Sequence, residues 1–288
     1  MESPPARLDL SLYAVPPTQL LTPTRGFVSV NLKEVWQSYE LLISLAKRDV
    51  RARYKQTALG AFWILAHPVL AAGIFTFIFT MVADLKAPGG VPYFLFTIAG
   101  LLAWNGFSSV MTRSAGALVG NAALVSKIYF PRLILPLATV LTVLVDFLVT
   151  LALLTVLLVV FWDLPGWSIL LMPVCVALLW AMALGVGLCA AAVAVSYRDA
   201  LFVLPVLTQF LMWGSAVLFP TDRVPQRFQW ILYLNPLVSL IEVFRWSVLG
   251  VGSTPWNAFA YSAGFAAVVL LCGLIAFRWL ERSFADVI

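Results

Sequence analysis

The stretch "KRDVRARYKQTALGAFW", residues 47–63, joins a dense basic cluster to the start of a long apolar run. After this cluster, no Asp, Glu, Lys or Arg occurs again until Asp84. A positive cluster beside an uncharged run of this length is typical of the cytoplasmic edge of a transmembrane helix. Its five basic side chains are Lys47, Arg48, Arg51, Arg53 and Lys55.

The composition of the whole chain supports a membrane protein. The 288 residues are 62% hydrophobic and 11% charged, with a mean hydropathy of +0.98. Soluble domains carry roughly a quarter charged residues, and a core of this size could not hide so much apolar surface. We therefore expect an all-α integral membrane protein with one polytopic domain.

The cysteines and the histidine give no sign of a metal site. Cys175, Cys189 and Cys272 are widely spaced, His67 is the sole histidine, and no CxxC or Cys/His spacing occurs. Neither a metal site nor a disulfide framework is expected. Residues 1–30 hold five prolines and no apolar run of signal-peptide length, which predicts a poorly ordered cytoplasmic tail. The first spanning helix must then direct insertion.

Long apolar runs mark the candidate spanning helices, each of which needs roughly 20 residues. Six spans place both termini on one side of the membrane. With the N-terminus in the cytoplasm, 14 of the 18 Lys and Arg fall in cytoplasmic segments, Arg113 being counted in the loop after the second run. This asymmetry predicts cytoplasmic N- and C-termini. The six runs are 59–83, 91–112, 133–162, 168–195, 200–219 and 256–278.

The segment 221–250 is too long for a turn and too interrupted for a full span. Two apolar pieces meet at Asn235-Pro236, and proline disfavours helix in the residue before it. Short apolar pieces are typical of re-entrant or interfacial helices. We favour a hairpin that dips back from outside over two helices lying on the outer surface. Glu242 and Arg245, three residues apart, could pair on one helix face.

Residues 33–55 have a helical period, with an apolar stripe and a basic face. Such a helix is expected to lie in the membrane interface, where each basic residue gains about 1 kcal/mol from anionic lipid. The basic face has three interpretations: a topological anchor, a docking face for a phosphorylated lipid-linked substrate or a partner protein, and nucleic-acid binding, for which no groove-reading element exists. The stripe comprises Val35, Tyr39, Leu42, Ala46, Val50 and Tyr54.

Catalytic motifs are missing from the sequence. The chain lacks even a Gly-Lys pair, so it cannot form a P-loop, and it has no GxSxG or HExxH. Asp146 is the only acid inside a predicted span, and such an acid is a functional candidate by default. Because no second ionisable residue occupies a span centre, we interpret Asp146 as a structural group bonded to a neighbouring helix. These absences favour a translocation path that is powered from elsewhere.

Four phrases, in order, carry a resemblance to a known family. They are "RDVRARYKQTALGAFWILAHPVL" (48–70), "NAALVSKIYFPRLILPLATVL" (121–141), "VSYRDALFVLPVLTQFLMWGSAVLFP" (195–220) and "LNPLVSLIEVFRWSVLG" (234–250). Together they resemble the membrane subunit of bacterial ABC exporters for lipid-linked polysaccharides such as O-antigen and teichoic acid. The resemblance covers about 31–280.

The resemblance implies a multi-pass protein of the bacterial inner membrane. Its parts would be a gate helix at 31–56, a six-span domain at 57–280 and a cytoplasmic tail at 281–288. It implies a homodimer with two ATPase subunits, which would bind ATP and Mg, and an undecaprenyl-diphosphate-type glycan as substrate. A related permease for drugs or small lipids, and a non-transporting membrane scaffold, remain the alternatives.

The resemblance also assigns roles to four groups of residues. The gate region, which would meet the lipid diphosphate, comprises Arg48, Arg51, Arg53, Tyr54, Lys55, Leu59 and Gly60. A short coupling helix that contacts the ATPase would involve Ser126, Lys127, Ile128, Tyr129, Phe130, Pro131 and Arg132. Channel-lining aromatics would be Phe75, Phe79, Phe202, Phe210 and Trp213. Outer gate helices would be built around Asn235, Pro236, Glu242 and Arg245.

The residue types suit these roles. Aromatic and basic side chains in the coupling segment suit a specific protein contact, and Pro131 suits the first turn of the next helix. An ordinary loop whose aromatics lie at the headgroup level is the alternative there. Aromatic rings can stack on the C–H faces of sugars, although each of the channel aromatics taken alone could equally be a packing or lipid-facing residue.

Overall fold

The computed structural model describes residues 36–55, 60–128, 130–161, 166–252 and 254–281, and every regular element within these ranges is helical. The α-helices are α2 (Tyr39–Lys55), α3 (Gly60–Phe77), α4 (Tyr93–Gly120), α5 (Ala122–Val125), α6 (Ile134–Val160), α7 (Met172–Ser196), α8 (Ala200–Gly214), α9 (Gln226–Leu234), α10 (Pro236–Leu249) and α11 (Trp256–Glu281). Short 3₁₀ or π segments are η2 (Ile78–Val82), η3 (Pro88–Gly90), η4 (Trp167–Leu171) and η5 (Thr221–Arg223).

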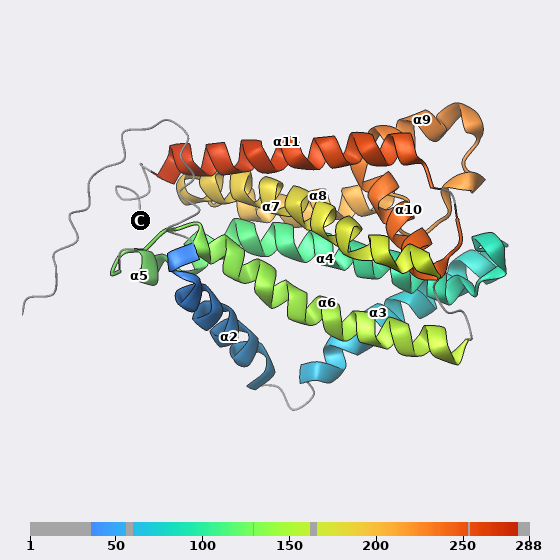
Figure 1. Ribbon diagram of the computed structural model, residues 1–288, viewed down its shortest axis with the longest axis horizontal. Helices are drawn as coiled ribbons and strands as arrows, with labels where there is room; N and C mark the ends of the chain where they lie inside the picture. The colour runs from blue at the N-terminus through green and yellow to red at the C-terminus, as the bar shows by residue number, and fades with distance from the viewer. Residues whose placement is uncertain (1–35, 56–59, 129, 162–165, 253, 282–288) are drawn as a thin grey trace, which may run out of the picture.

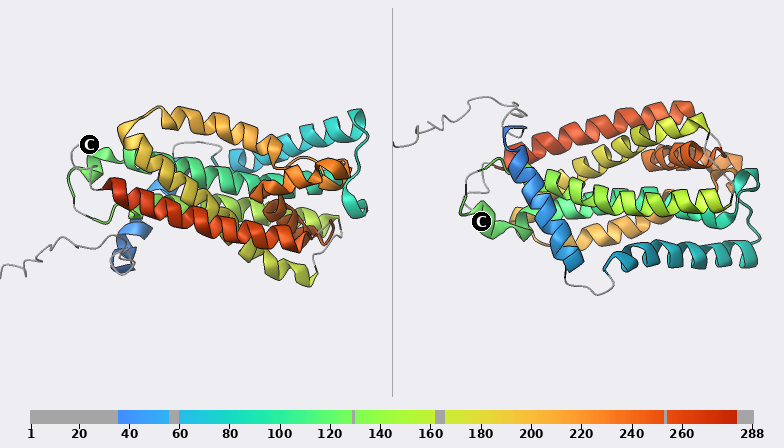
Figure 2. Two further views of the ribbon diagram at one scale, coloured as in Figure 1. Left: turned by 90° about the horizontal axis from the view of Figure 1, so that it is seen from above. Right: turned by 60° about the horizontal axis from the view of Figure 1, so that its bottom comes forward.

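The helices form an elongated bundle (Figure 1). The long helices α4, α6, α7 and α11 run along its length, with α8 beside them. At one end α2 crosses the bundle obliquely and packs on α6, near α5 (Figure 2, right). At the opposite end lie α9 and α10. The two regions that the sequence singles out therefore lie at opposite ends of the molecule.

Five of the described helical stretches are long and apolar enough to cross a membrane, which confirms a polytopic all-α protein. The expected break at Asn235-Pro236 is also confirmed, since α9 and α10 meet there at 100°. This bent pair is either a broken span or a re-entrant loop. The predicted fifth span, α8, has 15 residues, so the number of spans stays a prediction. The five stretches are Leu65–Val82, Tyr93–Gly120, Ile134–Val160, Trp167–Ser196 and Trp256–Glu281.

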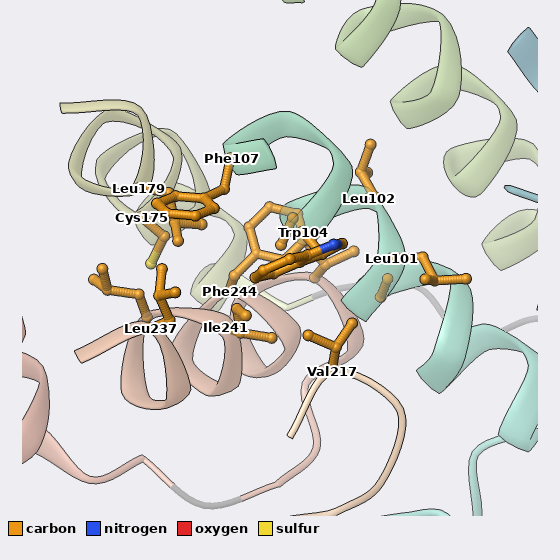
Figure 3. Packing of buried hydrophobic residues seen from close by; sticks show 14 of the residues in the cluster. Leu101, Leu102, Trp104, Phe107, Cys175, Leu179, Val217, Leu237, Ile241 and Phe244 are labelled. Atoms are coloured by element: carbon orange, nitrogen blue, oxygen red, sulfur yellow. The ribbon is translucent and has the colours of Figure 1, made fainter. Parts of the chain in front are cut away.

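The helix α4 is the centre of the bundle. Of its most apolar stretch, 78% of the residues are buried, against 11–33% in the other four candidates. Those helices keep open apolar faces, which a membrane protein tolerates because lipid tails are as apolar as leucine. Figure 3 shows the core where α4 meets α7 and α10. The residues labelled there are Leu101, Leu102, Trp104, Phe107, Cys175, Leu179, Val217, Leu237, Ile241 and Phe244.

Two predicted span ends are wrong. The second was expected to end at residue 112, with Arg113 in a loop, but α4 continues to Gly120 and holds Arg113 within the helix. This is possible because a carboxylate on α6 pairs with Arg113 there. The fifth was expected to reach residue 219, but α8 ends at Gly214.

The segment that follows α8 is irregular and buried. Residues 215–218 are buried outside any helix, and Ala216 has a φ of +50°. Non-helical backbone survives at membrane depth only where protein or water satisfies its polar groups. Here Tyr93 donates its hydroxyl to the carbonyl of Leu218 at 2.7 Å, and Arg245 binds the two preceding carbonyls. Side chains thus replace the helical hydrogen bonds, which is why the helix can stop early.

Candidate functional site

Asp146 on α6 draws together groups from two other helices. Arg113 on α4 donates from Nη2 to Asp146 Oδ2 at 2.9 Å, and Arg53 on α2 donates from Nη1 to the same oxygen. Tyr54, also on α2, donates its hydroxyl to Asp146 Oδ1 at 3.3 Å. The Asp146 side chain is 18% exposed. We call these four residues the Asp146 cluster. It confirms that Asp146 bonds to neighbouring helices and holds α2 against the bundle.

The Asp146 cluster has more positive than negative charge. Two guanidinium groups share one carboxylate, so the formal charge of the cluster is positive. Nη1 of Arg113 is buried and has no hydrogen-bond partner within the described part of the chain. A buried N–H without a partner costs free energy, so this nitrogen is a donor that a ligand could satisfy.

A cavity of about 220 Å³ lies beside the cluster and is lined by three of its members, Arg53, Arg113 and Asp146. Further polar lining comes from α3 and α4, and apolar side chains form the remaining walls. Such a volume is smaller than the roughly 300–1,000 Å³ of pockets for drug-sized ligands. The polar residues added by α3 and α4 are His67, Asn105 and Ser109, and the apolar walls include Trp63, Leu102, Val143 and Phe147.

Tyr54 titrates above its ordinary range. Burial raises the pKa of Tyr54 above 10.0, and the adjacent Asp146 carboxylate raises it further, while Arg53 and Arg113 oppose the shift. Removing a proton would place a second negative charge beside Asp146 in a partly desolvated position. Tyr54 therefore remains a hydrogen-bond donor to Asp146 at neutral pH.

The predicted gate residues on α2 include exposed arginines that nevertheless make side-chain bonds. Arg48 donates to Asp49 at 2.9 Å and to Oδ1 of Asn121, at the end of α4, at 2.8 Å. Arg53 is partly exposed and bonds Asp146, and Arg51 is exposed. The α2 helix thus turns apolar residues, including the buried Leu45, toward the bundle and leaves most of its basic side chains exposed, while Arg53 also reaches α6.

The link between α2 and α3 carries the remaining gate residues. Residues 56–59, which include Leu59, lie outside the described residues. Lys55 is the last residue of α2 and Gly60 is the first residue of α3. The roles assigned to Lys55, Leu59 and Gly60 stay predictions.

The short helix in this region lies before the segment in which a coupling helix was predicted. The short helix is α5, at Ala122–Val125, and Ser126–Ile128 form the turn that follows it. Tyr129 lies outside the described residues. Placing the helix within 126–132 was therefore wrong, because the chain must open out there to bring Phe130 into the core.

Phe130 is a core residue rather than an exposed anchor. It is buried in a cluster that includes Leu45 of α2. Arg132 donates from Nη1 to the carbonyl of Glu281 at 2.9 Å, and Pro131 lies before α6 rather than in its first turn. Ser126, Lys127 and Ile128 are exposed in the described part of this segment. Their contact with a partner stays a prediction.

The predicted channel aromatics form two sets. Phe75 stacks on Phe79 with ring centroids 6.4 Å apart and meets Trp213 of α8 edge-on at 6.2 Å, which joins α3 to α8. Phe202 and Phe210 are 77% and 72% exposed on α8. The structure brings the first three together and leaves the last two on an open face, and a channel role for either set stays a prediction.

At the end of the bundle opposite α2 (Figure 1), Asn235 organises the break between α9 and α10. Its Oδ1 accepts a hydrogen bond from the backbone N–H of Leu237 at 3.1 Å, which caps α10, and Pro236 takes the first helical position. Asn and Pro are favoured at these two positions. The amide of Asn235 also donates to the carbonyl of Gly214 at 3.1 Å and to Ser215 Oγ at 3.0 Å. One residue thus joins the hairpin to the end of α8.

Arg245 is 3% exposed and serves backbone groups. It donates to the carbonyls of Ala216, at 3.1 Å, and Val217, and its guanidinium lies 4.0 Å from the ring centroid of Phe96. We call Arg245 and its partners the Arg245 cluster. The helix α4 approaches closely here, since a Cβ at Gly100 would collide with the guanidinium and the carbonyl of Val217.

The expected pair between Glu242 and Arg245 is not formed in the described structure, so that prediction is wrong. Glu242 instead accepts hydrogen bonds from Thr221 and, at 3.0 Å, from the hydroxyl of Tyr233. The irregular carbonyls after α8 need a donor, and Arg245 is turned toward them. Both side chains line a cavity of about 340 Å³.

Several residues of the Asp146 cavity were missed from the sequence, above all Arg113. A signal existed, because an acid in an apolar span calls for a counter-charge. The partner of Asp146 could not be identified from sequence separation, since Arg53 and Arg113 lie 93 and 33 positions from it. His67, Asn105 and Ser109 carry no motif that could have placed them in one cavity.

The sequence is similar to several proteins of known name. The chain is 29% identical over 252 residues to "O-antigen export system permease protein RfbA" of Klebsiella pneumoniae, covering 87% of this chain and 95% of that protein. It is 32% identical over 216 residues to a protein of the same name from Myxococcus xanthus, covering 74% and 82%. It is 27% identical over 250 residues to "Polysialic acid transport protein KpsM" of Escherichia coli, covering 83% and 93%.

The family match spans both clusters. The model of the "ABC-2 type transporter" membrane family matches residues 40–249, from α2 to the end of α10. Asp146, Arg245 and the short helix α5 all fall inside it. The chain therefore belongs to the ABC-2 type transporter family.

Proposed function

We propose that the chain is the transmembrane subunit of an ATP-driven exporter that moves lipid-linked polysaccharide of the O-antigen kind. The observation that carries this proposal is the alignment of relatives named for O-antigen export and polysialic acid transport with 74–87% of the chain. The glycan would start at the cytoplasmic leaflet of the inner membrane. The absence of a P-loop from the sequence agrees with a separate ATPase.

The complex would contain two copies of this chain and two ATPase subunits, which bind ATP and Mg. Open apolar faces on the helices around α4 leave room for a second copy. The exposed Lys127 and Ile128, next to α5, suit a contact with the ATPase. The neighbouring helix α5 lies at the α2 end of the bundle (Figure 1), and this proposal assigns that end to the cytoplasm together with both termini.

The mechanism we infer begins at the basic face of α2. The lipid diphosphate docks there from the inner leaflet, near Arg51, Arg53 and Lys55. ATP-driven closure of the ATPase pushes α5 and α2. The push reaches the bundle because α5 contacts α4 and α2 packs on α6. The helices α3 and α8 part at their aromatic contact, the α9–α10 hairpin yields, and lipid and glycan move outward.

The first test is copurification with an ATPase. The tagged chain, expressed with the ATPase subunit of the same organism, should copurify with it, and a diphosphate-linked glycolipid should raise ATP turnover in proteoliposomes. Turnover that responds to drugs or small lipids and not to the glycolipid would favour the drug or small-lipid permease. Failure of any ATPase to copurify would instead favour a membrane scaffold.

The second test concerns the basic face. Reversing the charge at Arg51, Arg53 and Lys55 to Glu should stop glycan export while membrane insertion and ATPase binding persist. Lys47→Glu provides the control, because Lys47 is exposed on the same helix and is not among the proposed docking residues. Export that continues in the triple variant would leave the basic face as a topological anchor.

A further inference from the structure

The Asp146 cluster has an unusual balance of donors and acceptors. Arg53, Tyr54 and Arg113 all donate to one carboxylate, and Nη1 of Arg113 is left buried without a partner in the described residues. A cluster built only to fix α2 would be complete with one arginine. The second arginine gives the site capacity for another acceptor.

The surroundings of the cluster suit a small anion. The adjacent cavity, of about 220 Å³, is lined by both arginines and by His67, Asn105 and Ser109. Among the described residues of its lining, Asp146 is the one with an acidic side chain. Arginine presents a planar fork that matches phosphate oxygens, and desolvation by the apolar walls strengthens each charged contact.

We propose that this cavity binds a phosphate group, with Arg113 and Arg53 as its ligands and Asp146 as the counter-ion that holds the site until the phosphate arrives. The anion takes the unpartnered Nη1 of Arg113 and competes with Asp146 for the guanidinium groups. The apolar walls and small volume admit the phosphate end of a ligand and exclude a glycan. The assignment of the phosphate to a lipid diphosphate rests on the proposed function.

The exchange has a consequence for α2. Arg53 and Tyr54 tie α2 to α6 through Asp146, so an anion that takes the arginines loosens one attachment of this helix. Occupancy of the cavity would thus be coupled to the position of α2, the element on which the export mechanism acts. Arg53 would then exchange its bond to Asp146 for a bond to the ligand.

The decisive experiment compares two variants that should change the affinity for a phosphate compound in opposite directions. The full chain is placed in phosphatidylcholine nanodiscs without the ATPase, whose nucleotide site would itself bind phosphate. Binding of farnesyl diphosphate is measured by calorimetry, with farnesol as the phosphate-free control. Arg113→Lys should weaken binding by at least about tenfold, since lysine retains the charge and loses the fork. Asp146→Asn should tighten binding by about tenfold, because it removes the competing carboxylate.

The matched control is Lys47→Gln, which removes a positive charge from an exposed site on α2 outside the cavity. It should leave the dissociation constant within about twofold of the wild type, because an exposed charge outside the cavity is well screened by solvent and salt. A purely structural cluster makes the opposite prediction for Asp146→Asn, namely weaker binding, because the ion pairs that hold Arg53 and Arg113 in place are lost. Wild-type affinity in Arg113→Lys, or weaker binding in a folded Asp146→Asn variant, overturns the proposal.

Folding of each variant is checked by size-exclusion chromatography and circular dichroism. If Asp146→Asn does not fold, Arg113→Lys against Lys47→Gln decides, together with thermal stabilisation of the wild type by farnesyl diphosphate. Loss of that stabilisation in Arg113→Lys supports the site, and its persistence overturns it. Inorganic pyrophosphate identifies the source: equal binding indicates a free phosphate compound, and binding of farnesyl diphosphate alone indicates a lipid headgroup.

Failure of the inference is separable from failure of the proposed function. In the complex with the ATPase, a glycolipid that stimulates ATP turnover equally in wild type and Arg113→Lys would retain the exporter and remove the cavity from its mechanism. An ATPase complex that ignores the glycolipid, in a chain whose cavity binds farnesyl diphosphate, would retain the phosphate site and overturn the glycan assignment.

Discussion

The Asp146 cluster and the Arg245 cluster lie at opposite ends of the bundle, and each is built around an arginine of the bundle, half-buried Arg113 in the first and buried Arg245 in the second. The two arginines are satisfied differently. Arg113 binds a carboxylate that belongs to a side chain, whereas Arg245 binds two main-chain carbonyls. Each leaves one nitrogen without a hydrogen-bond partner in the described structure, Nη1 of Arg113 and Nε of Arg245.

The difference shows which arginine can change partners. A carboxylate can be displaced by another anion, because both compete for the same guanidinium group. Main-chain carbonyls can leave Arg245 only if the segment after α8 moves. We therefore interpret the Arg245 cluster as a fixed joint that holds the hairpin to α8, and the Asp146 cluster as an exchangeable one. Four variants test this comparison.

The largest effect is expected from Arg245→Met. Removing the guanidinium leaves the carbonyls of Ala216 and Val217 without their donor, which should cost about 3–5 kcal/mol. The apparent midpoint of thermal unfolding in detergent measures it. Arg227→Met, at an exposed arginine of α9, should change the midpoint little. Similar losses in the two variants would contradict a fixed joint at Arg245.

Gly100→Ala should come next. A methyl group there would meet the Arg245 guanidinium and the carbonyl of Val217, and overpacking of this kind costs about 1–3 kcal/mol. Gly116→Ala lies on the same helix with open space around it and is the matched control. Unfolding midpoints that do not distinguish the two alanine variants would show that Arg245 shifts freely, against our interpretation.

Arg53→Gln should have a smaller effect on stability. Asp146 keeps its bonds from Arg113 and Tyr54, and a partly exposed ion pair contributes about 1 kcal/mol or less. Hydrogen exchange of the α2 amides should nevertheless become faster, because one tie between α2 and α6 is lost. Lys47→Gln should leave that exchange unchanged. Unaltered exchange in Arg53→Gln would mean that the pair does not hold α2.

The smallest effect is expected from Tyr54→Phe. It removes the 3.3 Å hydrogen bond to Asp146, worth about 0.5–1 kcal/mol. The folded chain holds the Tyr54 proton more tightly than an unfolded one, since the pKa of Tyr54 is raised above 10.0. The free energy of unfolding should therefore fall as the pH rises above 10, and less steeply in the variant. Identical slopes in the two proteins would remove Tyr54 from the cluster.

Much of the fold follows from local features of the sequence. Proline at 236 lacks a backbone N–H and restricts residue 235, so the break between α9 and α10 was predictable. The apolar stripe of α2 was expected to face the membrane interface; in the structure Ala46 is buried and Leu42 and Val50 are half-buried, whereas Tyr39 of the same stripe is exposed. Phe130 was misjudged because an aromatic residue in a basic segment suits an interface and a core equally well.

The candidate site was predictable only in part. Asp146 was identified as an acid that needs a partner, and Arg53 as part of a basic face, but nothing linear joined the two. Arg113 was assigned to a loop because a charge was taken as the end of a span. Its pair with Asp146 removes that reason, since a paired charge is tolerated within the bundle.

The sequence alone determined that this is a helical membrane protein with a basic amphipathic helix before its first span and a proline break near its last. These properties depend on composition and on interactions between near neighbours in the chain. Only the tertiary structure decided the partners of the charged side chains within the bundle. Arg53, Arg113 and Asp146 meet because three helices pack together, and Arg245 turns from Glu242 to the carbonyls after α8 because those groups are buried without a helix to satisfy them.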